Sequence, residues 1–182
     1  VPQISVVLGP AAGGAAYGPA LTDIVIMSDH GRIFVTGPEV VRSVTGEQVD
    51  MERLGGPEPH GRRSGVVHVT TKDDETAFTT ARRLAALLGH QGRVTPADTV
   101  DESGEGRDLA ALLPPEANRA YDVKPVVSAL LDEPGVELHA KWAPNIVTTL
   151  GRFAGRTVGV IANNPLRLGG CLDAGAPPEQ PC

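Results

Sequence analysis

The amino-acid sequence predicts an α/β protein built from short strands and helices. Apolar runs of about five residues, typical of buried strands, alternate along the chain with segments whose apolar residues recur every three or four positions, as on one face of a helix. The chain also has 22 Gly and 16 Pro among 182 residues, which predicts many turns and few long elements. Aromatic residues are scarce, so Val, Leu, Ile and Ala must fill the core.

In the first half of the chain, strands and helices follow one another closely. A helix of small residues is expected over 15–21, and a second helix begins at Pro38, because proline suits a first helical position, and ends near Gly46. The segment 54–65 is rich in Gly, Pro and charge and is expected to be a loop. A longer helix begins at Asp73, and its expected apolar face comprises Ala77, Phe78, Ala81, Leu84, Ala85 and Leu88. The expected strands are 4–8, 23–27, 32–36 and 66–70.

The second half of the chain begins with a change in composition. Residues 89–108 lose periodicity and gain acidic side chains, which predicts a solvated linker, and Pro114 marks the start of a second unit. A helix is expected over 123–131. Two strands joined by a tight turn are expected at 146–153 and 156–162. The last segment, 174–182, has three Pro and no periodicity, and is expected to be disordered.

Charge and composition exclude several classes of function. Sixteen Lys and Arg against 22 Asp and Glu give a formal net charge of −6, which argues against nucleic acid as a partner. No apolar run approaches the ~18–20 residues of a membrane span, so no membrane association is expected. The two cysteines form no CxxC pair, which argues against a metal site and favours a reducing compartment, the cytoplasm.

The sequence GPAAGG (9–14), between an expected strand and an expected helix, is the motif with the most chemical content. Glycines let a ligand approach the backbone closely, and the start of the helix offers unpaired N–H groups to a phosphate, a carboxylate or a developing oxyanion. A tight turn with close helix–strand packing explains the motif equally well. A dinucleotide site with Asp29 on the ribose is a weaker alternative, because the spacing is not GxGxxG and the following helix is short.

Side chains offer little support for catalysis. Ser64 lies between His60 and His68, but no GxSxG motif frames it, so satisfied or solvated histidines are the favoured interpretation. The acidic run 73–75 fits a helix cap better than an acid catalyst or a metal site. Cys171 has no histidine near it in sequence and is interpreted as a packing residue.

Five segments together resemble a known family. They are GPAAGGAAYGPALTD (9–23), FVTGPEVVRSVTGE (34–47), LGGPEPHGRRSGVVH (54–68), RAYDVKPVV (119–127) and GRTVGVIANNPLRLGGCLD (155–173). In this order they resemble the carboxyltransferase (beta) subunits of biotin-dependent acyl-CoA carboxylases, in particular the propionyl-CoA and acetyl-CoA carboxylase beta chains of actinobacteria. The resemblance covers nearly all of residues 1–173.

The resemblance implies a crotonase-like (ClpP/crotonase) fold, a ββα superhelix that the family repeats in two domains. Residues 1–115 are similar to the later part of the N-terminal domain, and residues 116–173 to the opening of the C-terminal domain. Residues 174–182 depart from the family pattern. The chain is therefore expected to be a fragment that contains the end of one domain and the start of the next.

The resemblance also implies a reaction. In the family, a carboxyl group passes from carboxybiotin, carried by a biotinylated alpha subunit, to the α-carbon of propionyl-CoA or acetyl-CoA. Backbone amides hold the enolate, which maps the catalytic positions onto Gly13 and Gly14 and substrate-binding positions onto Ala15 and Ala16, with no metal. A second oxyanion hole, for biotin, belongs to a family segment beyond this chain. A homo-oligomer, a hexamer in the family, is implied as well.

Two other functions remain open at this point. The chain could be a non-catalytic fragment or assembly module, because it lacks the biotin-side oxyanion hole. It could also be another crotonase-like enzyme, such as a hydratase or thioesterase, which would need a carboxylate over the thioester. Glu39 and Glu47 are the acids near the relevant segments, and neither is placed convincingly.

Overall fold

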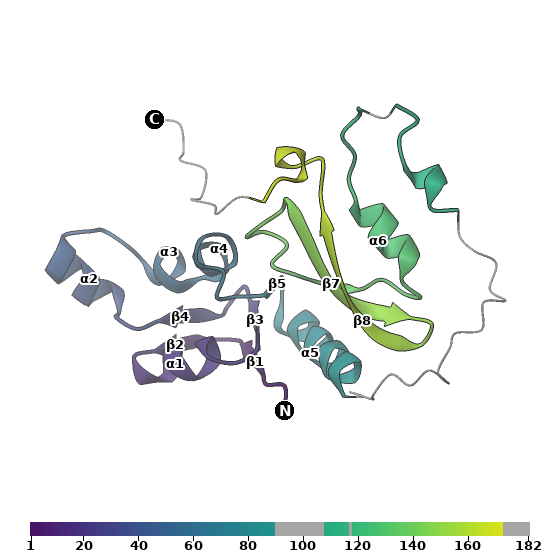
Figure 1. Cartoon of the computed structure of the whole chain (residues 1–182). Coiled ribbons are helices and arrows are strands. Elements are labelled where there is room, and N and C mark those ends of the chain that lie inside the picture. The colour runs from purple at the N-terminus through teal and green to yellow at the C-terminus, as the bar shows by residue number, and fades with distance from the viewer. Residues whose placement is uncertain (90–107, 117, 173–182) are drawn as a thin grey trace. The chain divides into compact units, whose positions relative to one another are not determined.

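The computed structural model of the chain describes residues 1–89, 108–116 and 118–172 (Figure 1). These residues form two compact units. The first comprises Val1–Ala85 with His139–Ala143, and the second comprises the described residues from Ala86 to Leu138 and from Pro144 onward. The predicted tail and nearly all of the predicted linker lie outside the described residues. The assignment of 1–115 and 116–173 to two family domains stays a prediction.

The first unit begins with two consecutive repeats of strand, strand and helix. Strands β1 (Ile4–Val7) and β2 (Pro10–Ala12) lead into helix α1 (Gly14–Ala20), and strands β3 (Ile24–Ser28) and β4 (Arg32–Phe34) lead into helix α2 (Pro38–Thr45). In parallel register β1 pairs with β3, and β2 pairs with β4. Strand β5 (Val69–Thr71) continues the first sheet in the order β1-β3-β5. Successive ββα repeats stacked in this way confirm the predicted superhelix.

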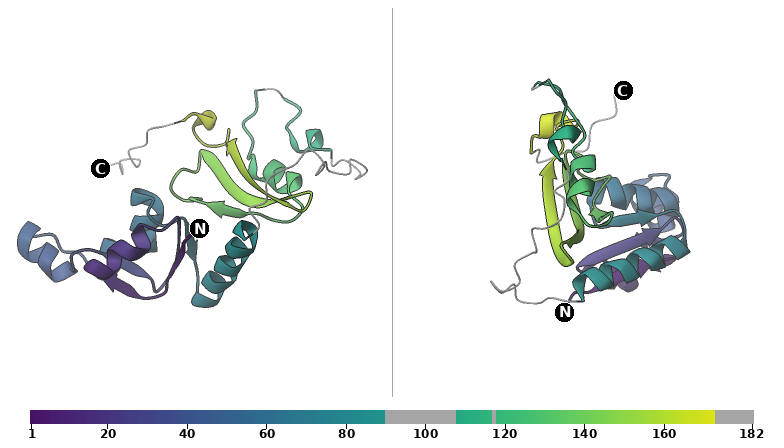
Figure 2. Two further views of the ribbon diagram at one scale, coloured as in Figure 1. Left: turned by 60° about the horizontal axis from the view of Figure 1, so that its bottom comes forward. Right: turned by 90° about the vertical axis from the view of Figure 1, so that its right-hand side faces the viewer.

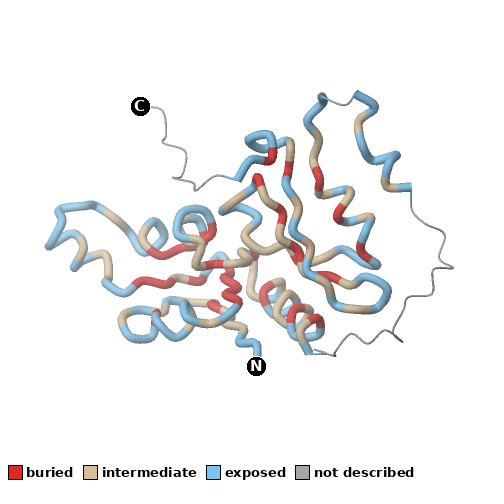
Figure 3. The backbone as a smooth tube through the Cα atoms, in the orientation of Figure 1, coloured by how far each residue is buried: buried red, intermediate tan, exposed pale blue. Residues whose placement is uncertain are grey.

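The core of this unit is centred on β3. All five residues of β3 are buried (Figure 3), as expected for the middle strand of a parallel sheet that is covered on both faces. The core cluster combines Val25 and Met27 of β3 with residues from other strands, from α1 and from the segment before β5: Val7, Ala16, Ile33 and Val67. Small aliphatic side chains fill this core, in agreement with the scarcity of aromatic residues.

The segment 54–65 is helical, so its prediction as a loop is wrong. It contains the end of α3 (Met51–Gly55), the single turn α4 (Pro57–Pro59) and the π-helix η1 (His60–Ser64). The glycine and proline residues in this segment serve packing and helix initiation. Gly55 is buried, and any Cβ there would collide with the Ile33 carbonyl, whereas Pro57 occupies a first helical position. The next strand therefore begins at Val69, three residues later than predicted.

The two predicted helices that flank this segment are confirmed. Helix α2 begins at Pro38 and ends at Gly46, whose φ of +77° is the left-handed conformation that favours glycine. Helix α5 (Asp74–Leu88) buries Ala77, Leu84 and Leu87. Phe78, predicted on the same face, is about half exposed, so the buried face is rotated slightly from the prediction.

The second unit contains an antiparallel sheet in the order β6-β7-β8. The predicted hairpin is confirmed as β7 (Ile146–Phe153) and β8 (Arg156–Asn163), whereas β6 (Val136–Leu138) was not predicted. Helix α6 (Lys124–Leu130) packs on one face of this sheet through Val127 and Val147 (Figure 2). Two 3-10 turns, η3 (Ala110–Leu112) and η4 (Leu168–Gly170), complete the unit. In the described part of the chain, no helix is long and apolar enough to cross a membrane.

Gly31, in the tight turn between β3 and β4, lets the backbone of this turn lie close to Val7 and Met27, and this packing can be tested. A Cβ at this position would lie 2.5 Å from the Val7 carbonyl oxygen and 2.6 Å from Met27 Cγ. We expect Gly31→Ala to lower the free energy of unfolding by about 1–3 kcal/mol, as overpacked core positions do. Gly159→Ala, at an exposed position of β8 where a Cβ would lie 3.8 Å from Leu150 Cδ2, an ordinary contact, should be neutral or slightly stabilising. Equal stability of the two variants in urea denaturation would contradict this packing.

Candidate functional site

The GPAAGG turn joins β2 to α1, and its shape depends on Gly13. This residue has φ +60° and ψ −130°, a conformation open to glycine and strained for other residues. Its N–H donates to the Phe34 carbonyl oxygen at the end of β4 (3.1 Å), and its own carbonyl accepts the N–H of Ala16 (3.0 Å). Both backbone polar groups of Gly13 are therefore used to fix the turn.

The N–H groups of Gly14 and Ala15 are arranged differently. They belong to the first turn of α1, where N–H groups have no partner within the helix. Within the described residues neither group donates to another part of the chain. The cap residue Gly13 has no side chain to bond to them, and the first turn contains no acidic residue that could do so. Both donors are left for an acceptor that is not part of the described chain.

The surroundings of these two residues are open on the solvent side. Gly14 and Ala15 are exposed, and a Cβ built on Gly14 meets nothing within 4 Å. Ala16 differs, because its side chain is 1% exposed and packs in the core. The structure thus brings all four predicted residues into one turn. Gly14 and Ala15 lie on the solvent side of this turn, whereas Gly13 and Ala16 hold the turn in place. Such an arrangement suits a carbonyl oxygen that gains negative charge.

His60 and Ser64 meet within η1. Ser64 Oγ lies 2.9 Å from His60 Nδ1, and His60 Nε2 lies 2.7 Å from the Ile33 carbonyl oxygen. Both ring nitrogens are thus engaged, which confirms the interpretation of a satisfied histidine. Ser64 is part of a π-helix rather than of the loop in which it was predicted.

His68 lies just before β5, not within a strand as predicted. Its Nδ1 accepts the N–H of Val25 (3.1 Å), and its ring centroid is 4.4 Å from that of His139. The backbone N–H of His139 donates to the His68 carbonyl oxygen (2.8 Å). Burial of the ring, and secondly the neighbouring His139, lower the pKa of His68 below its usual value of 6.5. His68 is therefore a structural residue that favours the neutral state.

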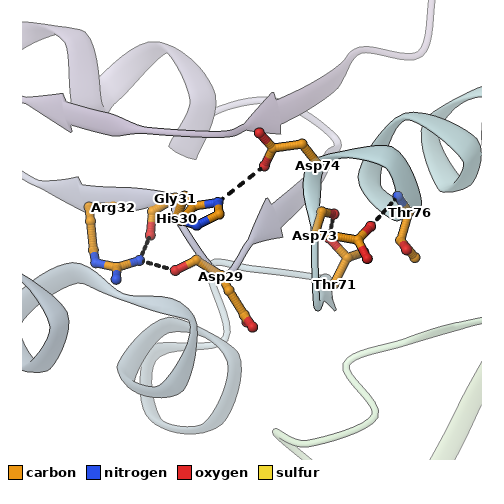
Figure 4. A network of polar contacts seen from close by, with 8 residues as sticks. All are labelled: Asp29, His30, Gly31, Arg32, Thr71, Asp73, Asp74 and Thr76. Carbon is orange, nitrogen blue, oxygen red and sulfur yellow. Dashed lines mark hydrogen bonds and ion pairs between the residues drawn. The ribbon is translucent and has the colours of Figure 1, made fainter.

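The acidic run at 73–75 is a helix cap, as predicted (Figure 4). Asp73 Oδ1 accepts the N–H of Thr76 (2.7 Å), and the Thr71 hydroxyl donates to the Asp73 carbonyl oxygen (3.0 Å). The hydrogen bonds with Thr76 lower the pKa of Asp73. Asp74 Oδ1 lies 3.7 Å from Nδ1 of the exposed His30. Among the residues with defined positions, no group of three His, Cys, Asp or Glu side chains could hold a metal ion.

The remaining candidate residues from the sequence are Asp29, Glu39, Glu47 and Cys171. The Asp29 carbonyl oxygen accepts a hydrogen bond from the Arg32 guanidinium (2.6 Å), which closes the connection between β3 and β4 (Figure 4). Glu39 and Glu47 are exposed. Cys171 is exposed rather than packed, so its interpretation as a packing residue is wrong.

Comparison with known proteins yields one family. The sequence model of the carboxyl transferase domain matches residues 1–177. The chain is 57% identical over 176 residues to the beta6 subunit of the biotin-dependent acetyl-/propionyl-coenzyme A carboxylase of Mycobacterium tuberculosis (strain ATCC 25618 / H37Rv), covering 96% of this chain and 37% of that protein. It is also 57% identical over 179 residues to the propionyl-CoA carboxylase beta chain of Rhodococcus erythropolis, with the same coverage. The chain thus spans little more than a third of the length of these relatives.

Solved structures agree with the sequence relatives. A crystal structure of a transcarboxylase 12S hexamer with hydrolysed methylmalonyl-coenzyme A bound has a TM-score of 0.83 and 40% identity, covering 95% of this chain and 35% of that chain. A single-chain, multi-domain long-chain acyl-CoA carboxylase has a TM-score of 0.79 and 30% identity, covering 96% of this chain and 17% of that chain. These similarities confirm the crotonase-like fold predicted from the sequence.

The lowered pKa of His68 predicts a pH dependence of stability. The unfolded chain binds a proton at His68 more readily than the folded chain, so the contribution of His68 is complete above about pH 6.5 and is lost as the pH falls toward the folded-state pKa. We expect the free energy of unfolding to fall between pH 7.5 and pH 5.5. In His68→Asn, which keeps an acceptor for the Val25 N–H but cannot titrate, the fall should be smaller. An unchanged slope in His68→Asn would contradict the assignment.

Proposed function

The chain belongs to the carboxyl transferase domain family, and from this premise we propose that it forms the acyl-thioester-binding part of the carboxyltransferase of a biotin-dependent acyl-CoA carboxylase. The observation that carries the proposal is the pair of open N–H groups at Gly14 and Ala15, on a turn that the rest of the fold holds rigid. Propionyl-CoA and acetyl-CoA are the substrates we propose, because relatives that are 57% identical carry these names.

The proposed chemistry follows from where charge develops. Transfer of the α-proton of an acyl thioester to a base, which we propose is the biotin that has released its carboxyl group, places negative charge on the carbonyl oxygen. Two N–H donors that already point at this oxygen stabilise the charge without having to reorganise. The Gly14 and Ala15 amides supply these donors, while Gly13 and Ala16 set their direction. Such a site needs no ionisable side chain of its own, which agrees with the satisfied state of His60 and the exposed positions of Glu39 and Glu47.

The carboxyl group is supplied by carboxybiotin, which we propose is carried by a biotinylated partner subunit. No contact among the described residues points to a place for the biotin ring, so none of them is assigned to it. The role of this chain in the reaction is to bind the thioester and to hold its enolate. The α-carbon then lies in a fixed position for the carboxyl group that it accepts.

We extend the proposal to assembly with further copies of the chain, as in the 12S hexamer. Helix α2 supports this extension, because none of its residues is buried. Its apolar side chains lie on one face of the helix, and two of them are strongly exposed, Val40 at 51% and Val44 at 78%. An apolar helix face of this kind is typical of a protein–protein interface.

Gly14→Pro tests the proposed oxyanion donors directly. Gly14 is the first residue of α1, where proline fits the helix but has no N–H, so one donor is removed with little change in structure. Residues 1–177 would replace the matching segment of the Rhodococcus erythropolis propionyl-CoA carboxylase beta chain, assembled with its biotinylated partner. Fixation of labelled bicarbonate that depends on propionyl-CoA should fall about 10²–10³-fold in kcat.

The matched control is Gly14→Ala, which adds a side chain in open space and keeps the N–H. This variant should retain most of the activity. Normal turnover by Gly14→Pro, or equal losses in the two variants, would contradict the assignment of the Gly14 amide. An inactive chimera that still forms the native-sized complex would contradict the proposed function itself.

The assembly proposal predicts an effect of Val44→Gln. This change removes an exposed apolar side chain from α2 and should shift the chain toward smaller species in sedimentation velocity, with no loss of thermal stability. Arg42→Gln, on the opposite side of the same helix, should leave the sedimentation unchanged. A Val44→Gln variant that sediments like the wild type would rule out this face as the interface.

A further inference from the structure

We infer that His60 is a positioning residue for the Gly13 turn: it holds β4 in place from the side opposite to the turn. The inference rests on the proposed function, because the turn it positions is the site proposed there. His60 lies 27 residues from Ile33 in sequence, and its ring bonds to Ser64 and Ile33, neither of which belongs to the turn. Its effect passes through the backbone of β4.

Strand β4 connects His60 to the turn because successive carbonyl groups of a strand point to opposite edges. The Phe34 carbonyl oxygen points to the β2 side and accepts the N–H of Gly13 (3.1 Å). The Ile33 carbonyl oxygen, one residue earlier, points to the other edge. Among the described residues, no strand is paired with that edge of the two-stranded sheet β2-β4. His60 Nε2 occupies the place of the missing strand, 2.7 Å from this oxygen.

The protonation of the His60 ring follows from its two partners. A carbonyl oxygen can only accept, so Nε2 must carry the hydrogen that is shared with Ile33. In the neutral imidazole Nδ1 is then an acceptor, and the Ser64 hydroxyl donates to it (2.9 Å). The ring is thus fixed at both nitrogens, and it cannot serve as a general base while these bonds persist. The contribution of His60 is therefore one N–H donor, at Nε2, that is directed at the Ile33 carbonyl oxygen.

Close packing makes β4 sensitive to this donor. Gly55, at the end of α3, lies so close to β4 that any Cβ would collide with the Ile33 carbonyl and with the Phe34 ring. Figure 1 shows β4 between β2 on one side and the helices α3 and α4 on the other. Loss of the His60 bond leaves the Ile33 carbonyl without its partner and lets this edge relax. Because Phe34 is the next residue, the relaxation changes the hydrogen bond that sets the direction of the Gly14 and Ala15 amides.

The test compares variants that differ in the donor at the Nε2 position. His60→Gln can place an amide N–H near Nε2, whereas His60→Ala has no donor. Arg63→Ala, at an exposed neighbour in η1, is the control for general effects on this helix. In the full 182-residue chain, amide hydrogen exchange of Gly13 should be accelerated at least tenfold by His60→Ala and little changed by His60→Gln or Arg63→Ala. Exchange at Ala77 and Leu84 in the core of α5 reports global stability and should stay constant.

The same substitutions in the chimeric carboxylase connect position to chemistry. His60→Ala should lower kcat on the order of 10- to 100-fold with little change in KM, because a misplaced oxyanion donor weakens transition-state binding more than substrate binding. His60→Gln should recover most of this loss. A residue with a merely structural role would instead lower thermal stability and leave kcat per folded enzyme unchanged.

Each outcome bears on the inference separately from the proposed function. Unchanged Gly13 exchange in His60→Ala overturns the inference, and so does accelerated exchange without loss of kcat. Accelerated exchange with a loss of kcat that His60→Gln restores supports it. If the unsubstituted chimera is inactive, the proposed function fails, while the exchange data still show whether His60 holds the turn.

Discussion

The hydrogen bond from the Gly13 N–H to the Phe34 carbonyl oxygen is the contact on which the candidate site depends. It joins the turn between β2 and α1, inside the first ββα repeat, to the second strand of the next repeat, at the point where β2 and β4 finish side by side. The left-handed φ of Gly13 is compatible with this bond and with the immediate start of α1. Without it, Gly14 and Ala15 would have no fixed direction. The superhelical repeat therefore shapes the candidate site, because β4 of the second repeat orders the turn between β2 and α1 of the first.

This origin explains why the site contains backbone groups rather than reactive side chains. The histidines near it are engaged in hydrogen bonds that hold backbone segments, His60 on β4 and His68 on β3. A carboxyltransferase requires an enolate to be stabilised and two reactants to be held in register, and amides on a rigid turn meet the first need. In the proposed function the chain contributes the geometry of backbone amides, and His60 and His68 hold the strands around them.

Much of the fold could be predicted from local patterns. The apolar runs of β1 and β3, the Pro38 start and Gly46 end of α2, and the β7–β8 hairpin all follow from periodicity and turn residues. Segment 54–65 could not be predicted in this way. Its Gly55 serves a close approach to β4, a requirement that comes from tertiary packing. A glycine needed for space and a glycine needed for a loop look identical in a sequence.

The position of the candidate turn could be predicted, whereas its role in binding stays a proposal. Resemblance to the family located the turn and its four residues, but which N–H groups remain open depends on partners far away in the chain. Phe34 takes the Gly13 amide, and the core takes the Ala16 side chain. Neither of these contacts can be predicted from the residues next to the turn in sequence. The contact of His60 with Ile33, across 27 residues, could not be predicted from the local sequence either. The spacing of four residues between His60 and Ser64 did indicate that these two could meet in a helix.

Binding of a thioester oxygen by the Gly14 and Ala15 amides can be observed directly by nuclear magnetic resonance. The ¹⁵N-labelled chain would be titrated with propionyl-CoA and, separately, with CoA, which has no acyl carbonyl group. We expect the amide protons of Gly14 and Ala15 to move downfield with propionyl-CoA and not with CoA, while the Gly13 amide, already bonded to Phe34, moves less. Amide signals of Gly14 and Ala15 that respond equally to both ligands, or to neither, would contradict it.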